Sequence, residues 1–231
     1  MSYYQPKRLP REPVTISQEM PLLIDIRKLR IINQLMRSGT ENVTEALATL
    51  ADVESRVDIK SLSFVEPADI AAEIGTDELY SASIQLREPP YGVFLLTFPR
   101  ETGEEMAALM TGTAVDGEFN QLQESALQEM CNILTSGFID GIANTLGTTI
   151  DMETPELRYS SGVTVAEQTL SHVRKDSLSI VLDSMIDVAD EDAAFKVRVF
   201  LVPDPGSFVN LLDHLSVEEI ADRAESKGEL P

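Results

Sequence analysis

Apolar and polar positions along this chain follow two different periods. In 29–50 and 121–147 the apolar residues recur every three or four positions, which predicts a pair of amphipathic helices in each segment. The run KVRVF at 196–200 instead alternates polar with apolar residues, as in a half-buried strand. Similar runs, rich in β-branched and aromatic residues, predict strands at 56–67, 78–88, 91–99, 148–161, 177–188 and 193–203, and shorter helical segments follow at 104–112 and 207–215.

This order of segments occurs twice, at a spacing of about 95 residues. Phe98-Pro99 of the first half corresponds to Val202-Pro203 of the second, and each half is predicted as helix, helix, strand, strand, strand, helix. The short polar segment 190–192 predicts an antiparallel hairpin. Long helices with consecutively paired strands indicate an α+β fold with an antiparallel sheet.

The domain boundaries follow from the same pattern. One domain is expected over 21–215, made of two repeats at about 22–115 and 116–215. Residues 1–20 contain three prolines and no helical pattern, which predicts an extended N-terminal arm. Residues 216–231 are predicted as a short amphipathic helix or tail.

Composition narrows the class of partner. The chain has 231 residues, 43% of them hydrophobic, and a net charge of −21 from 39 acidic and 18 basic residues. Such a surface repels nucleic acids and anionic membranes, so neither is expected as a partner. Only six of the basic residues are lysines, and this acidic, lysine-poor composition resembles that of proteins from salt-in halophiles such as haloarchaea. A single cysteine and the lack of an 18-residue apolar run predict a soluble, cytoplasmic protein.

Three polar residues and a proline occur at a defined spacing in the second half of the chain. Ser125, Glu129 and Asn132 are separated as i, i+4 and i+7, so they share one face of a helix, and 22 residues lie between Asn132 and Pro155. The spacing predicts a polar surface site opposite an apolar arc; that arc is formed by Ala126, Leu127, Met130, Ile133 and Leu134. Ordinary solvated helix residues are the alternative interpretation, which the adjoining NILTSGF sequence and the internal repeat disfavour.

The spacing resembles the signature (D/S)-x3-E-x2-N-x22-P of the CheC/CheX/FliY phosphatase family of chemotaxis. The resemblance covers about 22–215 and implies a pseudo-twofold fold with two long outward-facing helices. It also implies hydrolysis of the phospho-aspartate of a CheY-type response regulator. In that scheme Asn132 positions the water and Glu129 pairs with a lysine of the regulator, while Ser125 and Pro155 support the site. The regulator supplies Mg2+, so no metal or cofactor of this chain's own is expected.

The first half lacks this chemistry. The segment that contains Gly39 and Asn42 matches the first helix of the family without a gap. In this match the functional positions are occupied by Arg30, Gln34 and Arg37, so this first site is predicted to be catalytically inactive. The two arginines form either a solvated face or a docking patch for an acidic partner.

Two other functions remain open at this point. One is a non-enzymatic adaptor that binds the CheD deamidase or an archaeal motor-adaptor protein. The other is a structural role in a flagellar switch complex, which retention of the glutamate and asparagine disfavours. Other chemistry is weaker: Cys131 is expected on the flank of the Ser125 face without a histidine partner, and His172 and His214 are expected to be structural. The acidic group Asp183, Asp187, Asp190, Glu191 and Asp192 lacks a calcium-loop pattern.

Overall fold

The computed structural model describes residues 26–50, 52, 54–66, 69–171, 179–188 and 194–215. The predicted arm at 1–20, the predicted tail at 216–231, His172 and the hairpin segment 190–192 lie outside these described residues. In chain order the elements are α1 (Ile26–Leu50), β1 (Ser55–Val65), α2 (Ile70–Ile74), β2 (Glu78–Leu86), β3 (Gly92–Phe98), α3 (Arg100–Thr111), α4 (Gln121–Leu146), β4 (Glu156–Ser161), α5 (Gly162–Ser171), β5 (Ser179–Val188), β6 (Ala194–Pro203) and α6 (Pro205–His214).

The strands form one antiparallel sheet in the order β1-β5-β6-β3-β2-β4. Its two halves are related by a pseudo-twofold axis between β6 and β3, where Leu96 pairs with Val199. The first strand of each half pairs with a strand of the other half: β1 with β5, and β4 with β2. The two repeats therefore share one sheet. The predicted α+β class is confirmed, while the predicted domain boundaries stay a prediction.

The predicted order of elements was wrong in two respects. Each predicted helix pair is a single continuous helix, α1 of 25 residues and α4 of 26 residues. A short helix, α2 or α5, stands between the first and second strands of each half, so the order is helix, strand, helix, strand, strand, helix. Gly39, Gly137 and Gly141 lie inside these continuous helices, where they permit close packing.

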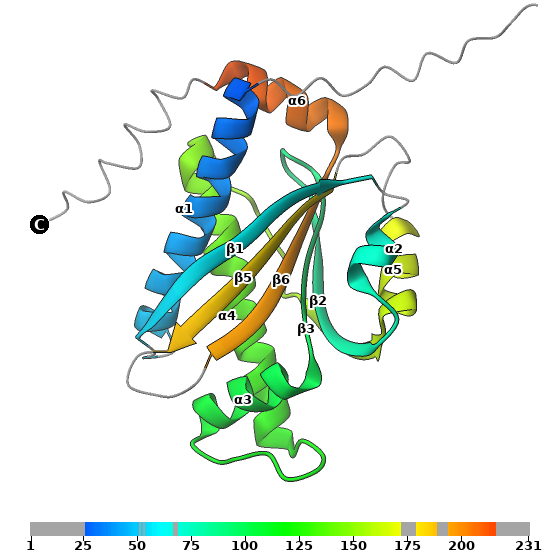
Figure 1. Ribbon diagram of the computed structural model, residues 1–231. Helices are drawn as coiled ribbons and strands as arrows, with labels where there is room; N and C mark the ends of the chain where they lie inside the picture. Colours follow the sequence, from blue (N-terminus) through cyan, green and yellow to red (C-terminus); the bar gives the residue numbers. More distant parts are fainter. Residues whose placement is uncertain are drawn as a thin grey trace, which may run out of the picture.

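Helices cover both faces of the sheet (Figure 1). The larger core joins α1, α3, α4 and α6 to one face, with Phe94, Phe195 and Leu182 of the sheet almost fully buried in it. The smaller core joins α2 and α5 to the opposite face around Phe200. Alternate residues of β3 and β6 point to the two cores, as the strand period requires.

The two long helices cross in direct backbone contact. A Cβ atom at Gly141 would lie 2.3 Å from the Ser38 carbonyl oxygen, so only glycine fits there without displacing the helix. Nearby, Asn42 Nδ2 donates a hydrogen bond to the Gly137 carbonyl oxygen at 2.8 Å. Contact positions that rise along α1 fall along α4, which makes the helices antiparallel (Figure 1). The corresponding polar faces of the two repeats consequently lie toward opposite ends of the helix pair.

Candidate functional site

The N-terminus of α4 is fixed by a capping box. Asn120 Oδ1 accepts hydrogen bonds from the backbone N–H groups of Leu122 and Gln123 at 2.9 and 3.0 Å. The Gln123 side chain accepts one in return from the Asn120 N–H at 3.1 Å and donates another to the Ala114 carbonyl at 3.3 Å. These contacts satisfy helix N–H groups that have no partner within the helix and set where α4 begins. Because the start of α4 is fixed, the direction in which each residue of the following turns faces is fixed too, and those turns carry the candidate site.

The structure places the three polar residues of the signature on one side of α4. Ser125 and Glu129 are exposed and Asn132 is half-buried. Four of the five residues of the expected apolar arc are buried and Ala126 is half-buried. The arrangement of these side chains agrees with the helical spacing in the sequence, while their chemical roles stay a prediction.

The three side chains differ in the contacts they make. Ser125 Oγ donates to the carbonyl oxygen of Gln121 at 2.9 Å, one turn back along its own helix. Within the part of the chain that the structure describes, no hydrogen bond or ion pair engages the side chain of Glu129 or Asn132. The carboxylate and the carboxamide are therefore available to a partner, whereas the Ser125 hydroxyl is already used locally.

Pro155 lies beside the stretch of α4 that carries these three residues. It is buried immediately before β4, and its carbonyl oxygen accepts a hydrogen bond from Gln128 Nε2 at 2.9 Å. The preceding connection is held at two further points on the β2–β3 hairpin. Asp151 N–H donates to Glu88 Oε2 at 2.8 Å, and Arg87 pairs with Glu153 at 2.6 Å. Gln128 was not anticipated from the sequence, because its partner lies 27 residues away and depends on the path of that connection.

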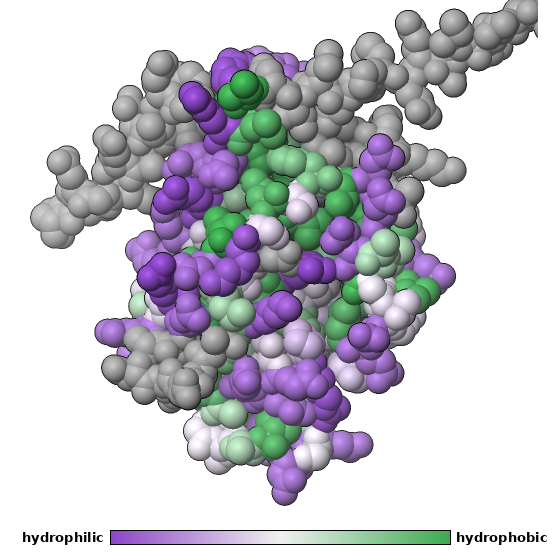
Figure 2. Space-filling view, viewed as in Figure 1, coloured by the Kyte–Doolittle hydropathy of each residue, from purple (hydrophilic) through white to green (hydrophobic). Residues whose placement is uncertain are grey.

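The corresponding positions of α1 present a different surface. Arg30 and Arg37 are exposed and Gln34 is half-buried. Figure 2 shows hydrophilic side chains along the edge of the molecule that α1 forms. Among the described residues neither arginine has an ion-pair partner, whereas Arg27 and Lys28 both pair with Asp213, at 3.7 and 2.8 Å. Pro67, the nearest candidate for the signature proline in this half, lies outside the described residues.

The expected place of Cys131 was wrong. Its thiol is buried in the larger core rather than on the flank of the Ser125 face, and this burial raises its pKa to about 12. The thiol consequently stays protonated at neutral pH, which disfavours a nucleophilic role. His214 lies at the end of α6 with its Nδ1 atom 2.6 Å from the Asn210 carbonyl oxygen, a local contact within the helix.

Two absences among the described residues bear on other classes of function. No group of three or more histidine, cysteine, aspartate or glutamate residues among them is arranged to hold a metal ion. None of the described helices is both long enough and apolar enough to cross a membrane. The expectation that any magnesium comes from a partner stays a prediction.

Comparison with known proteins places the chain in a family. The model of the CheC-like family matches residues 122–159, which run from the first turn of α4 into β4. A Halobacterium salinarum protein named "Putative CheY-P phosphatase CheC1" is 33% identical over 198 residues, covering 85% of this chain and 100% of that protein.

Solved structures share the fold at low sequence identity. Thermotoga maritima FliY superposes with a TM-score of 0.65 at 13% identity, covering 88% of this chain and 96% of that one. FliM in the Helicobacter pylori FliM–SpeE complex has a TM-score of 0.58 at 11% identity, covering 90% of this chain and 100% of that one. These structures share the fold, and the relative from Halobacterium, together with the matching family model, shows that the chain belongs to the CheC-like family.

Proposed function

We propose that this protein dephosphorylates a phospho-aspartyl CheY-type response regulator in chemotaxis, using the polar face of α4. The observation that carries the proposal is the available Glu129–Asn132 pair beside Pro155, within the segment that matches the family. The name of the Halobacterium relative, "Putative CheY-P phosphatase CheC1", supports the same substrate.

The proposed role of Asn132 is to position the attacking water. Hydrolysis of an acyl phosphate needs a water in line with the leaving carboxylate oxygen, and positioning and electrostatics do most of the work. A carboxamide offers a donor and an acceptor and stays neutral, so it can orient the water from both sides. Asn132 is half-buried, which restricts the motion of its side chain. A rate gain of about 100-fold corresponds to only about 2.7 kcal/mol of barrier, within reach of one well-placed group.

The proposed role of Glu129 is to bind and orient the regulator. Its exposed carboxylate stands one turn before Asn132 and is free to pair with a lysine near the phosphorylated aspartate. Magnesium, in this proposal, remains with the regulator, where it neutralises the phosphoryl oxygens. This chain then contributes orientation and a positioned water, and it needs no metal ligand of its own.

Replacement of Glu129 by alanine should weaken regulator binding more than it lowers the rate of phosphate release from the bound complex. We expect the regulator concentration at half-maximal rate to rise about 10-fold, because a partly desolvated ion pair is lost. Steady-state phosphate release at a series of regulator concentrations measures this. Glu167→Ala, which removes an exposed carboxylate from α5 on the opposite side of the sheet, is the matched control and should change neither value. An unchanged half-saturating concentration in Glu129→Ala would remove the anchoring role.

The arginine face of α1 supports a second, non-enzymatic activity. Two exposed arginines without described ion pairs, on a protein of net charge −21, are suited to an acidic surface of another protein. CheD and an archaeal motor-adaptor protein are the proposed candidates. The two activities are compatible, because the faces lie toward opposite ends of the helix pair.

A double change of Arg30 and Arg37 to glutamate should reduce binding of this second partner and spare phosphate release. The partner's binding to the unaltered protein should weaken as salt is raised, because the attraction is between exposed charges. Pull-down and phosphate release are measured on the same variant. Arg56→Glu with Lys60→Glu on β1 makes the same charge change elsewhere and serves as the control. Loss of phosphate release with intact pull-down would mean that α1 also engages the regulator.

A further inference from the structure

We infer that Gln128 is a positioning residue for the reaction on α4, acting through the backbone of Pro155. The inference rests on the proposed phosphatase function and assigns a role to one of the unspecified positions of the signature. Its basis is the hydrogen bond of 2.9 Å from Gln128 Nε2 to the Pro155 carbonyl oxygen. This bond directly joins α4 to the start of β4 at the level of the candidate site.

The direction of the chain after Pro155 shows what lies beside Asn132. Tyr159 of β4 contacts Tyr80 at 4.7 Å between ring centroids, and Tyr80 contacts Phe119 at 5.9 Å, just before α4 begins. Residues after Pro155 thus approach the N-terminal end of α4, and residues before it lie toward the later turns. Asn132 stands one turn after Gln128, so the segment preceding Pro155 approaches the side of the helix that carries Asn132.

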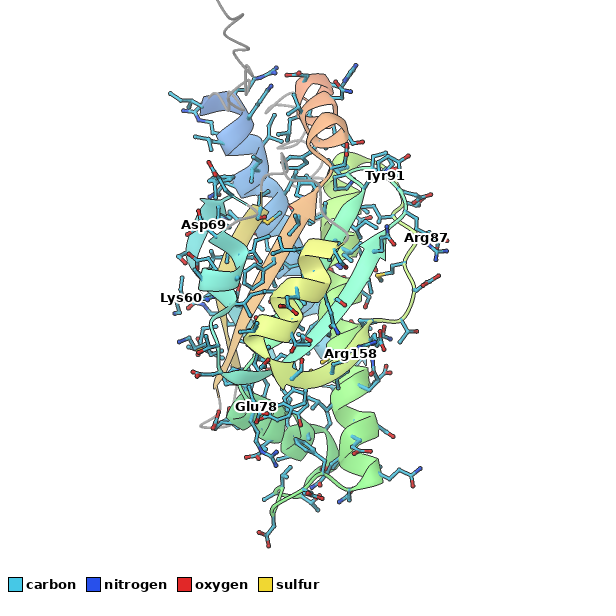
Figure 3. The ribbon with its side chains drawn as sticks, turned by 90° about the vertical axis from the view of Figure 1, so that its right-hand side faces the viewer. Lys60, Asp69, Glu78, Arg87, Tyr91 and Arg158 are labelled. Carbon is cyan, nitrogen blue, oxygen red and sulfur yellow. The ribbon has the colours of Figure 1, made fainter. Side chains whose placement is uncertain are left out.

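The connection that reaches Pro155 is held at both ends. Figure 3 shows Arg87, at the end of β2, and Arg158, on β4, on the side of the molecule where this connection runs. Arg87 and Glu88 hold the earlier part through Glu153 and the Asp151 N–H. Gln128 holds the last residue before the strand. Arg87, Asp151 and Glu153 in those earlier contacts are exposed, whereas Pro155 is buried, so the Gln128 bond sets the final approach of the chain to α4.

Proline suits this place for a chemical reason. It has no backbone N–H, so its carbonyl is the only backbone polar group that it brings into the buried position. A long carboxamide on the adjacent helix satisfies that carbonyl while filling the space beside it. Without the donor, the chain before β4 would shift away from α4 so that the Pro155 carbonyl could reach water. The segment that precedes Pro155, beside Asn132, would move with it. Glu129 faces solvent, so regulator binding would be unaffected.

The test separates this role from a purely structural one. Gln128→Met keeps the size and removes the donor, Gln128→Glu keeps the shape but cannot donate when ionised, and Gln128→Lys keeps a donor of similar reach. We expect the maximal rate of phosphate release to fall about 10-fold in the methionine and glutamate variants, because displacement of the segment before Pro155 misplaces the water held by Asn132. The half-saturating regulator concentration should stay within about twofold of the wild-type value, and the lysine variant should recover most of the rate.

The controls make each outcome decisive. Gln168→Met, an exposed glutamine of α5, should behave as the wild type. Melting temperatures of all variants are measured in the assay buffer, and the glutamate–lysine comparison stands if the methionine variant fails to fold. Wild-type rates in the methionine or glutamate variant, a rise in half-saturating concentration alone, or a lysine variant as slow as the other two would overturn the inference. An inactive wild-type protein would overturn the proposed function itself, which is a separate result.

Discussion

Replacement of Asn132 by alanine should abolish the stimulated dephosphorylation of the regulator, with a loss of about 100-fold in rate, and leave the fold intact. The side chain makes no hydrogen bond within the described part of the chain, so its removal leaves no buried partner unsatisfied. The lost group would be the one that orients water. Phosphate release at saturating regulator, with the circular dichroism spectrum recorded alongside, measures both effects.

Asn144→Ala is the matched control for this variant. Asn144 is exposed on the same helix, three turns beyond the site and on another side of it, so its removal should change neither rate nor fold. If Asn132→Ala dephosphorylates the regulator as fast as the wild type, the assignment of the site is wrong. The adaptor function on the α1 face would then be the better account of this protein.

Gly141→Ala should destabilise the protein by about 3 kcal/mol, near the upper end of the cost of overpacking a core. The new Cβ would stand 2.3 Å from the Ser38 carbonyl oxygen and 2.7 Å from Gly39 Cα, and both are backbone atoms that only a shift of α1 could move. The free energy of unfolding from a denaturant titration measures the loss.

The control for this change is Gly206→Ala on α6. There the nearest atom to the new Cβ would be Asp204 Oδ1 at 3.5 Å, an ordinary contact, and alanine should be neutral or stabilise by up to about 1 kcal/mol. Equal stability of Gly141→Ala and the wild type would mean that the two long helices are not held in backbone contact.

Much of the fold could be predicted because strand alternation is a local signal. The runs at 78–88 and 91–99 became β2 and β3, whose apolar residues point into the larger core or, as Leu95 does, into the smaller one. The short helices α2 and α5 could not be predicted in this way. The five residues of α2 are too few to show a helical period, and both helices take their stability from packing on the sheet. The long helices were predicted as pairs, whereas each is continuous, and the glycines in their interiors permit close contact between them.

The candidate site was predictable where it depends on helix geometry. Ser125, Glu129 and Asn132 share a face because their spacing matches the helical period. Cys131 was misplaced because the prediction assumed one buried arc, whereas α4 packs against both α1 and α3 as well as the sheet, which widens that arc. The bond between Gln128 and Pro155 depends on how the chain returns from the end of α4, which no local pattern encodes.

The central claim is that this protein removes phosphate from a response regulator, and the decay of the phosphorylated cognate CheY-type protein tests it most directly. The decay is followed in molar salt, which the acidic, lysine-poor composition favours, with and without substoichiometric amounts of the wild-type protein. We expect one molecule of this protein to dephosphorylate many molecules of regulator, at a rate well above the intrinsic decay. A decay that stays at the intrinsic rate at every concentration of this protein would contradict the proposed phosphatase function.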